Sequence, residues 1–574
     1  MRQVNHRVDF CVVGGGLAGM CAAVAAARHG ARVLLMQDRP VLGGNASSEI
    51  RMWVGGAHGP NNKETGIIEE ISLENMYRNP MRNYSIWDSV LYEKVKLEKN
   101  ITLLLNCTCV DLEMDGDRIK RVKGWQMTAE TWHTVEARLF ADCSGDSILV
   151  PLSGAEFRIG REAAGEFDES IEPETADRKT MGMSCLIQAR ETDRPQPYIP
   201  PAWANKYLSD DELPFRDHDV RQSNFWWIEL GGENDTIHDT EDLRDELLKI
   251  AFGVWDHIKN QGDHGADNWA LDWVGFLPGK RESRRYVGDY IMTQNDVRAG
   301  GRFDDVAAYG GWTMDDHHPA GIRHPGQPTI YHHAPSPFGI PYRCMYSKNI
   351  ENLFCAGRNI SATHAAMSAT RVMATCAIVG QAVGTAAAIA ASDGLSPRGV
   401  YEHRIQALQQ ALLEDDCFLP WLMREIPELT KKAKLTSSEG HPEPLRNGFD
   451  RPIGDWSNRW RGSIGAWVEY RFRKAVKLSE LRFVFDSDLN READGMACCY
   501  PLDQKSAGIP ARMVRKFRIE ALNKAGEWDI VAEIKNNYQR LVRMAVDIET
   551  KAVRFVPLET WGEASVSVFA WDVR

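Results

Sequence analysis

The first forty residues alternate between segments typical of strands and a segment typical of a helix. Residues 8–13 are mostly apolar, a glycine-rich turn follows them, and residues 17–29 are rich in alanine. A second apolar run covers residues 32–36. This order of strand, tight turn, helix and strand predicts a βαβ unit and therefore a parallel sheet.

Two later apolar segments predict strands that return to the same sheet. They cover residues 140–145 and 352–357, and each ends on a glycine. An alanine-rich helix is expected over residues 359–391. The intervening residues 151–340 are rich in Trp, Pro, His and charged side chains, and we expect them to form an inserted substrate or cap domain. Within it, Phe225–Glu229 is typical of a strand.

The last part of the chain changes to a period-two pattern. Short alternating segments are separated by turn residues such as those at 523–526. This pattern predicts an all-β sandwich with strands at 466–472, 481–485, 516–521 and 552–557. Residues 1–150 are therefore predicted to form the first part of a dinucleotide-binding domain, and residues 341–415 its last part. The cap domain covers residues 151–340 between them. A linker at 416–444 and the sandwich at 445–574 follow.

The turn after the first predicted strand has the spacing of a phosphate-binding loop. Gly14, Gly16 and Gly19 follow the G-x-G-x-x-G pattern, in which the glycines permit a tight turn, close approach to a pyrophosphate and close packing of helix on strand. The position that usually carries an acidic ribose ligand holds Gln37, with Asp38 next to it. The motif and its context predict a bound dinucleotide.

Several separated motifs give a family resemblance over residues 7–415. They are GGNASSEIR at 43–51, DCSGD at 142–146 followed by residues 154–164, GIPYR at 339–343, and AGRNISATHAAMSATRVM at 356–373. The chain resembles a bacterial family of FAD-dependent oxidoreductases of the glutathione-reductase and fumarate-reductase structural type. The C-terminal region resembles the discoidin or galactose-binding-like jelly roll, whose modules often bind glycans.

The resemblance implies an α/β fold: a Rossmann-type FAD-binding fold with an inserted cap domain, followed by a C-terminal jelly-roll sandwich. It implies FAD as the cofactor and does not identify a substrate. The residues expected to hold FAD are Gly14, Gly16, Leu17, Ala18, Gly19, Gln37, Asp38, Arg39, Gly43, Gly44, Asn45, Ser47, Asp142, Gly145, Asp146, Gly357, Arg358 and Met373.

Candidate catalytic residues come from a histidine-rich stretch and from the motif near the expected flavin. Imidazole titrates near neutral pH, so His332, His333 and His364 are candidate acids or bases. Arg343 and Arg371 are candidate clamps for an anionic substrate. No regular ligand spacing occurs among the histidines, and we predict no metal site.

Composition excludes some partners. The net charge is -12 and the pI near 5.8, so nucleic acid and anionic membranes are not expected partners. We expect no membrane span, no signal peptide before the first strand, and a cytoplasmic location. The 12 cysteines fit buried thiols better than a disulfide framework.

The predicted function is hydride transfer between flavin and a small polar substrate, such as a carbohydrate, polyol or hydroxy acid. The aromatic cap and the sandwich favour a sugar-related substrate and a place in carbohydrate metabolism, by analogy alone. The alternatives are a flavin monooxygenase and a non-catalytic glycan-binding or scaffold protein with a degenerate flavin fold. The direction of reaction, the electron acceptor and homo-oligomerisation stay open.

Overall fold

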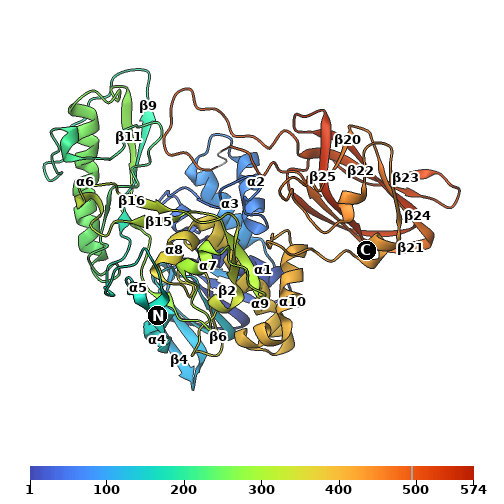
Figure 1. Cartoon of the computed structure of the whole chain (residues 1–574), viewed down its shortest axis with the longest axis horizontal. Coiled ribbons are helices and arrows are strands. Elements are labelled where there is room, and N and C mark those ends of the chain that lie inside the picture. Colours follow the sequence, from blue (N-terminus) through green and yellow to red (C-terminus); the bar gives the residue numbers. More distant parts are fainter. Residues whose placement is uncertain (493–494) are drawn as a thin grey trace. The chain divides into compact units, whose positions relative to one another are not determined.

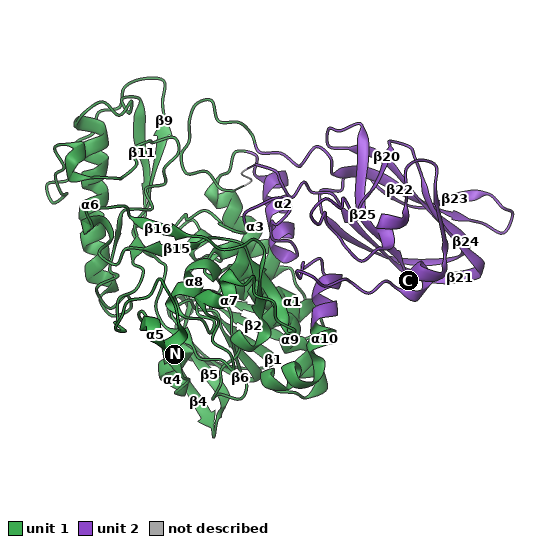
Figure 2. Ribbon diagram, viewed as in Figure 1, with its two compact units in different colours: residues 1–57, 81–408, 495–506 green, residues 58–80, 409–494, 507–574 purple. Residues whose placement is uncertain are grey.

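A computed structural model describes residues 1–492 and 495–574. The chain forms two compact units (Figure 2). Unit 1 comprises residues 1–57, 81–408 and 495–506, and unit 2 comprises residues 58–80, 409–494 and 507–574. Each unit is therefore discontinuous in sequence. Residues 58–80 belong to unit 2, although they precede most of unit 1 in the chain.

Unit 1 is built on a largely parallel sheet (Figure 1). Its strands lie in the order β3-β2-β1-β6-β5-β4, and β18 pairs with the second half of β6. Strands β1, β2, β3, β6 and β18 pair in parallel, whereas β4 and β5 are antiparallel to their neighbours. The strands are β1 (Arg2–Val13), β2 (Val33–Met36), β3 (Ile101–Leu104), β4 (Cys107–Asp115), β5 (Arg118–Gln126), β6 (Thr131–Asp142) and β18 (Leu353–Cys355).

Helices α1 (Leu17–Arg28) and α9 (Met373–Asp393) pack against each other at backbone distance. A Cβ atom added at Gly380 would lie 2.0 Å from the carbonyl oxygen of Ala18, and one added at Gly384 would lie 2.1 Å from that of Ala22. Successive contacts advance by one helical turn on both helices in the same direction, so the two helices run parallel. Their N-termini therefore lie at the same end of the pair.

Smaller elements complete unit 1. The helices are α3 (Tyr84–Lys96), α4 (Leu149–Ser153), α5 (Ala164–Phe167), α6 (Thr240–Asn260), α7 (Gln294–Arg298), α8 (His364–Thr370) and α10 (Pro397–Glu414), which continues into unit 2. The short sheets are β8 (Met183–Ser184), β10 (Glu229–Leu230) and β12 (Gly279–Lys280); β9 (Ile187–Glu191) and β11 (Trp269–Val274); β7 (Phe157–Arg158) and β13 (Arg285–Tyr286); β14 (Val306–Gly310) and β17 (Phe338–Pro341); and β15 (Met314–His317) and β16 (Thr329–His332).

Unit 2 is an antiparallel β-sandwich. Its strands lie in the order β20-β25-β21-β24-β22-β23, with β19 paired to β21. The core is strongly aromatic and also contains Leu73 and Met76 of α2. Arg491 forms a 2.6 Å ion pair with Glu69 of that helix, and both side chains are buried. The elements are α2 (Ile67–Arg78), α11 (Glu428–Lys432), β19 (Lys434–Ser437), β20 (Trp460–Ser463), β21 (Val468–Phe485), β22 (Val514–Leu522), β23 (Trp528–Ile534), β24 (Leu541–Thr560) and β25 (Ser565–Val573).

Three local predictions need correction. The helix predicted over 359–391 is two helices, α8 and α9, because Val372 between them has extended backbone (φ -64°, ψ 145°). The strand predicted at Phe225–Glu229 is absent from most of that range, since Phe225 has a φ of 60° that strands do not adopt. The predicted strands 466–472 and 481–485 are parts of one long strand, β21, interrupted by register shifts.

Helix α9 is long and apolar enough to cross a membrane by length and composition. In the structure, 89% of its most apolar window is buried inside the protein. Its apolar character is therefore accounted for by its place in the core of unit 1, between α1 and other elements of that unit.

The close packing of α1 on α9 gives a direct test. Alanine normally stabilises a helix relative to glycine. We expect Gly380→Ala to lower the free energy of unfolding instead, by about 1–3 kcal/mol, because its Cβ would overlap the backbone of α1. Gly165→Ala in α5 is the control, since nothing lies within 4 Å of the added Cβ. Equal or higher melting temperatures for Gly380→Ala in thermal unfolding would contradict this packing.

Candidate active site

Unit 1 contains a cavity of about 580 Å³ at the carboxyl ends of its parallel strands. Val13 at the end of β1, Met36 at the end of β2 and Cys143 after β6 line it. Ligands of open α/β sheets bind at this edge, and the size lies in the usual range for ligand pockets. The cavity therefore has the place and volume expected for a cofactor with room for a small substrate.

Two glycine turns form one wall of the cavity. Gly43 donates from its backbone N–H to the Gly15 carbonyl at 2.8 Å, and Gly43 has a φ of 104° that favours glycine. A Cβ added at Gly44 would lie 3.1 Å from the Cα of Gly16, whereas one added at Gly16 would have only Gly44 within 4 Å. The open side of Gly16 therefore leaves backbone exposed to a ligand, as pyrophosphate binding requires.

Two helices begin at this wall. Residues at the start of α1 and of α9 line the cavity, including Leu17, Met373 and Cys376. Among the described residues, neither N-terminus is capped by a side-chain hydrogen bond, and neither first turn contains an acidic residue. The partial positive charges of these two helix ends suit the phosphates and the electron-rich ring of a flavin nucleotide.

Gln37, the residue expected to contact the ribose, lines the cavity and also makes two hydrogen bonds within the protein. The Gln37 amide oxygen accepts from the Gly15 N–H at 2.7 Å, and its amide nitrogen donates to the Val41 carbonyl at 3.2 Å. Gln37 thus fastens the glycine turn to the following loop. Asp38 also lines the cavity and is exposed, so its carboxylate is the acidic group available to ribose hydroxyls.

A charged triad, formed by Asp146, Lys280 and Arg358, lines the cavity. Asp146 accepts from Lys280 Nζ and from an Arg358 guanidinium nitrogen, each at 2.7 Å, and from Ser283 Oγ at 2.9 Å. Burial raises the pKa of Asp146, but Arg358 and Lys280 outweigh burial, so the net pKa is lowered. The triad joins three segments distant in sequence and presents two cations to the cavity.

Most residues predicted to hold FAD line this one cavity. Those that do are Gly14, Gly16, Leu17, Ala18, Gln37, Asp38, Arg39, Gly43, Gly44, Asn45, Ser47, Gly145, Asp146, Gly357, Arg358 and Met373. Gly19 and Asp142 do not. A Cβ on Gly19 would lie 1.8 Å from the Gly14 carbonyl oxygen, so Gly19 serves helix packing. Asp142 is buried and accepts hydrogen bonds from Ser144, Leu149 and Tyr286, which hold the turn after β6.

A second group of polar residues lines the cavity away from the glycine turns. His317 lies between two carboxylates: its Nδ1 is 2.7 Å from Glu229 Oε2 and its Nε2 is 3.3 Å from Asp315 Oδ2. Arg281 lies 3.3 Å from Glu229, and Arg371 lies 3.1 Å from Asp315. All but Glu229 belong to the cavity lining, together with the aromatic residues Trp53, Trp226, Trp312 and Tyr331.

The charges in this group are fixed by their neighbours. Burial raises the pKa of both carboxylates, but Arg281 and His317 outweigh it at Glu229, and His317 and Arg371 outweigh it at Asp315. Both pKa values are therefore lowered, and both groups are ionised. Each ring nitrogen of His317 faces a carboxylate oxygen, and an ionised carboxylate oxygen only accepts hydrogen bonds.

Among the predicted catalytic residues, Arg371 lines the cavity and the others do not. His364 is buried and bonded on both sides, with Nδ1 2.9 Å from Glu282 and Nε2 3.2 Å from Asp316. Arg343 is paired with Asp305 at 2.9 Å. His332 is the last residue of β16, and His333 follows it.

The sequence pointed toward the missed residues without selecting them. Arg281 lies in the cationic run 280–285, and His317 lies in the histidine-rich stretch. Strand β15 explains the selection: side chains alternate between faces, so Asp315 and His317 share the cavity face while Asp316 reaches His364. The face of a four-residue strand is not readable before its partner β16 is known.

The paired cysteines of β4 also line the cavity. Burial raises the pKa of Cys107 and of Cys109 to about 12, so both are protonated thiols near neutral pH. No disulfide bond joins the cysteines in the described part of the chain. A protonated thiol is a poor nucleophile, and the geometry supports packing for these residues instead of redox chemistry.

The glycine wall predicts a variant that separates folding from cofactor binding. A side chain at Gly16 meets little protein, so Gly16→Val should keep the wild-type melting temperature of the cofactor-free protein while occupying the pyrophosphate space. We expect loss of bound flavin, measured by absorbance after gel filtration. Flavin retention at wild-type stoichiometry would contradict the assignment of this wall.

The carboxylates around His364 predict a pH dependence of stability. Burial, helped by Glu162, raises the pKa of Glu172 from 4.5 to about 7. A raised carboxyl pKa stabilises the fold at low pH, and this contribution is lost as pH rises from about 4.5 through 7. Relative to Glu172→Gln, the wild type should lose about 3 kcal/mol across this window in denaturant unfolding. A constant difference between the two proteins would refute the assignment.

The structure is similar in part to the family 32 carbohydrate-binding module of Streptococcus pneumoniae EndoD, with 14% identity, a TM-score of 0.20, and coverage of 25% of this chain and 94% of that one. It is similar also to the family 32 module of C. perfringens NanJ in complex with galactose, with 12% identity, a TM-score of 0.19 and coverage of 25% and 94%. It is similar as well to a fucose binding module of Streptococcus pneumoniae, with 10% identity, a TM-score of 0.20, and coverage of 26% of this chain and 94% of that one. The search of curated proteins gave no match.

A family model described as FAD dependent oxidoreductase matches residues 9–412. The matched range contains the glycine wall, the charged triad, and His317 with the carboxylates of Glu229 and Asp315. The prediction of FAD as the cofactor is confirmed by this match, and the residues of the cavity fit that cofactor. The chain belongs to the FAD dependent oxidoreductase family.

Proposed function

We propose that this enzyme moves hydride between FAD and a small hydroxylated or oxo carboxylic acid of sugar size, with reduction as the favoured direction. The observation that carries the proposal is the group formed by His317, Arg281 and Arg371 at the cavity wall. FAD, when bound, supplies or accepts the hydride. The protein's residues bind the substrate and move the accompanying proton.

The charge of the group favours an anionic substrate. Two guanidinium groups and one imidazolium face two carboxylates, which leaves one positive charge uncompensated. Arg371 Nε is buried, and no hydrogen-bond partner for it is found among the described residues. A substrate carboxylate would neutralise the charge and occupy this donor, as guanidinium groups commonly do for carboxylates.

The aromatic residues favour a substrate with several C–H groups on one face. Trp226, Trp312 and Tyr331 line the same cavity as the charged group. Flat aromatic faces pack well against such surfaces, and hydroxyl groups at the rim remain free to bond polar neighbours. A sugar acid combines both properties, which is the basis for naming this substrate class.

The contacts of His317 favour reduction, because both its ring nitrogens face carboxylate acceptors and the ring is suited to hold two protons. In that direction the substrate's carbonyl carbon takes the hydride and its C=O π bond breaks. The oxygen takes the proton of His317 Nε2, which exchanges its 3.3 Å contact with Asp315 for one with the substrate, and the oxygen becomes the hydroxyl group. Glu229 and Asp315 orient the ring and lower the cost of holding its charge. Oxidation would run the same steps backward and needs His317 without one proton.

The test uses matched substrates and the reduced holoenzyme. Flavin reduced anaerobically with dithionite is mixed with an oxo sugar acid or with the neutral sugar of the same carbon skeleton. We expect reoxidation at least about 10-fold faster with the acid, the effect of one charge-assisted hydrogen bond. Equal rates with the two compounds would contradict recognition of the substrate carboxylate. No reoxidation by either compound would contradict the proposed substrate class. A protein that fails to bind FAD would favour the scaffold alternative.

The role of His317 can be tested against a neighbour on the same strand pair. We expect His317→Asn to retain FAD and to slow flavin reoxidation by about 100-fold or more, the usual effect of losing an acid–base group. His332→Asn is the control, because His332 lies on β16 opposite Met314 and outside the cavity lining. Loss of rate in His332→Asn, with His317→Asn unaffected, would reverse the assignment.

A further inference from the structure

Unit 1 holds a second group of titratable side chains, outside the cavity lining. One ligand atom from each of four side chains lies within 4.8 Å of the other three. We call this group the histidine cluster, and it consists of Asp210, His218, His257 and His264.

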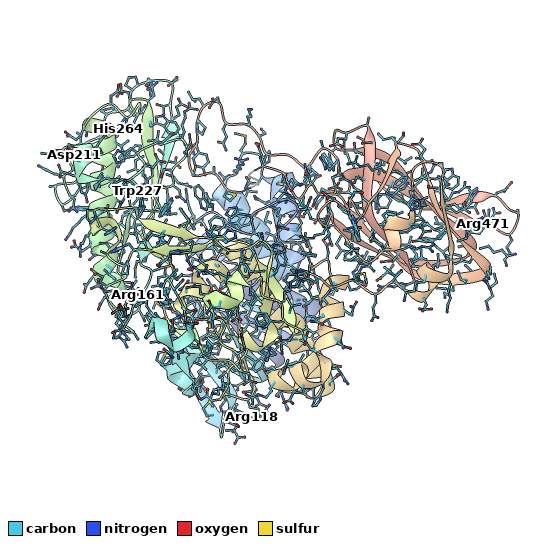
Figure 3. The ribbon with its side chains drawn as sticks, in the orientation of Figure 1. Arg118, Arg161, Asp211, Trp227, His264 and Arg471 are labelled. Atoms are coloured by element: carbon cyan, nitrogen blue, oxygen red, sulfur yellow. The ribbon has the colours of Figure 1, made fainter. Side chains whose placement is uncertain are left out.

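The cluster joins an irregular segment to the end of a helix. Asp210 begins the short 3-10 helix Asp210–Glu212, and His218 follows it in the stretch that leads to β10. His257 lies in the last turn of α6, and His264 lies in the loop after that helix. Figure 3 labels His264, together with Asp211 and Trp227, in the part of unit 1 that contains α6.

Three imidazole rings converge on one carboxylate oxygen. Asp210 Oδ1 is 3.0 Å from His257 Nε2, 3.5 Å from His264 Nε2 and 3.8 Å from His218 Nδ1. The ring centroids lie 4.8 Å apart for His257 and His264, and 4.9 and 5.0 Å from His218 to these two rings. Such a constellation has the shape of a coordination shell.

The hydrogen bonds of the cluster leave acceptors facing one another. His257 Nδ1 lies 3.0 Å from the Tyr207 carbonyl oxygen, which only accepts, so Nδ1 carries the proton. The lone pair of its Nε2 then faces the lone pairs of Asp210, unless a cation stands between them. His218 Nε2 and His264 Nε2 are also buried, and no hydrogen-bond partner is found for them among the described residues. A single added proton satisfies only one of these contacts, whereas one metal ion can take one ring nitrogen from each of the three histidines together with an oxygen of Asp210.

We propose that the histidine cluster binds one Zn²⁺ ion. Three imidazole nitrogens and one carboxylate oxygen are a ligand set that Zn²⁺ takes in tetrahedral geometry, with ligand distances of about 2.0–2.2 Å. Ligands at that distance stand roughly 3.4 Å apart, close to the separations from Asp210. The Tyr207 carbonyl is the outer partner that fixes the ring of a metal-bound histidine.

The ion has both an entry path and a structural task. The Asp210 side chain is 72% exposed, while that of His257 is 1% exposed, so the site opens to solvent on the carboxylate side. Residues 192–228 carry no regular helix or strand except the 3-10 helix at Asp210. A long segment without regular structure needs contacts that hold it in one conformation. This segment contains Trp226, which lines the cavity, and Glu229 of the proposed active site directly follows it.

The experiment measures metal content of the full-length protein, purified without an affinity tag and in zinc-containing buffer. We expect one zinc per chain after gel filtration, and visible absorption bands of tetrahedral Co²⁺ after exchange. His264→Gln should lower zinc affinity by more than about 100-fold, since loss of an outer partner alone costs 10–100-fold. His238→Gln is the control, because His238 is exposed and bonded to Asp235 in the same unit.

A second measurement keeps the test valid if His264→Gln folds poorly. Wild-type protein is treated with a chelator, and its thermal unfolding is compared with that of the same sample after Zn²⁺ is restored. We expect the melting temperature to fall and then recover, with FAD absorbance as a check on folding. Zinc below one-tenth per chain, or a melting temperature indifferent to both treatments, would overturn the proposal. Neither readout depends on the substrate of the enzyme.

Discussion

The cofactor site depends on how closely helices α1 and α9 approach each other. Gly380 and Gly384 place no side chain against the backbone of Ala18 and Ala22, so the two helices touch directly and in parallel. Because they are parallel, their uncapped N-termini open at the same wall of the cavity. Larger residues at these positions would separate the helices and move one positive helix end away from the ligand.

The second organising feature is the alternation of charged side chains along β15. Asp315 and His317 face the cavity, and Asp316 faces the buried carboxylates around His364. One short strand thus divides two electrostatic environments. On the cavity side Arg281, Arg371 and His317 form the site proposed for an anion, whereas on the other side burial, helped by Glu162 and Glu169, raises the pKa of Glu172. The strand keeps His317, the proposed acid, apart from His364, which is bonded on both sides.

The sequence predicted the features that depend on local geometry. Glycine spacing requires a particular turn, and that turn has few uses besides phosphate binding, so the cavity wall was predictable residue by residue. The proposed catalytic group around His317 could not be predicted in the same way, because it depends on which face of β15 packs inward. The hydrogen bonds of Gln37 could not be predicted for a similar reason: its type suits a ribose, but which backbone groups it meets, here the Gly15 N–H, depends on how the neighbouring loop packs. The histidine cluster was not predicted, because its members come from an irregular segment, the end of α6 and the loop after it, with no fixed spacing.

The assignment of residues 58–80 to unit 2 has a consequence for how the protein is made. Helix α2 is synthesised early, but the strands that cover Leu73 and Met76 leave the ribosome several hundred residues later. During that interval its apolar face has no native partner, and contacts this distant in sequence form slowly. A fragment that begins at residue 445 would lack both this helix and the buried partner of Arg491. The core of the sandwich therefore cannot be completed until its last strands are made, although one of its pieces is among the first parts of the chain to be synthesised.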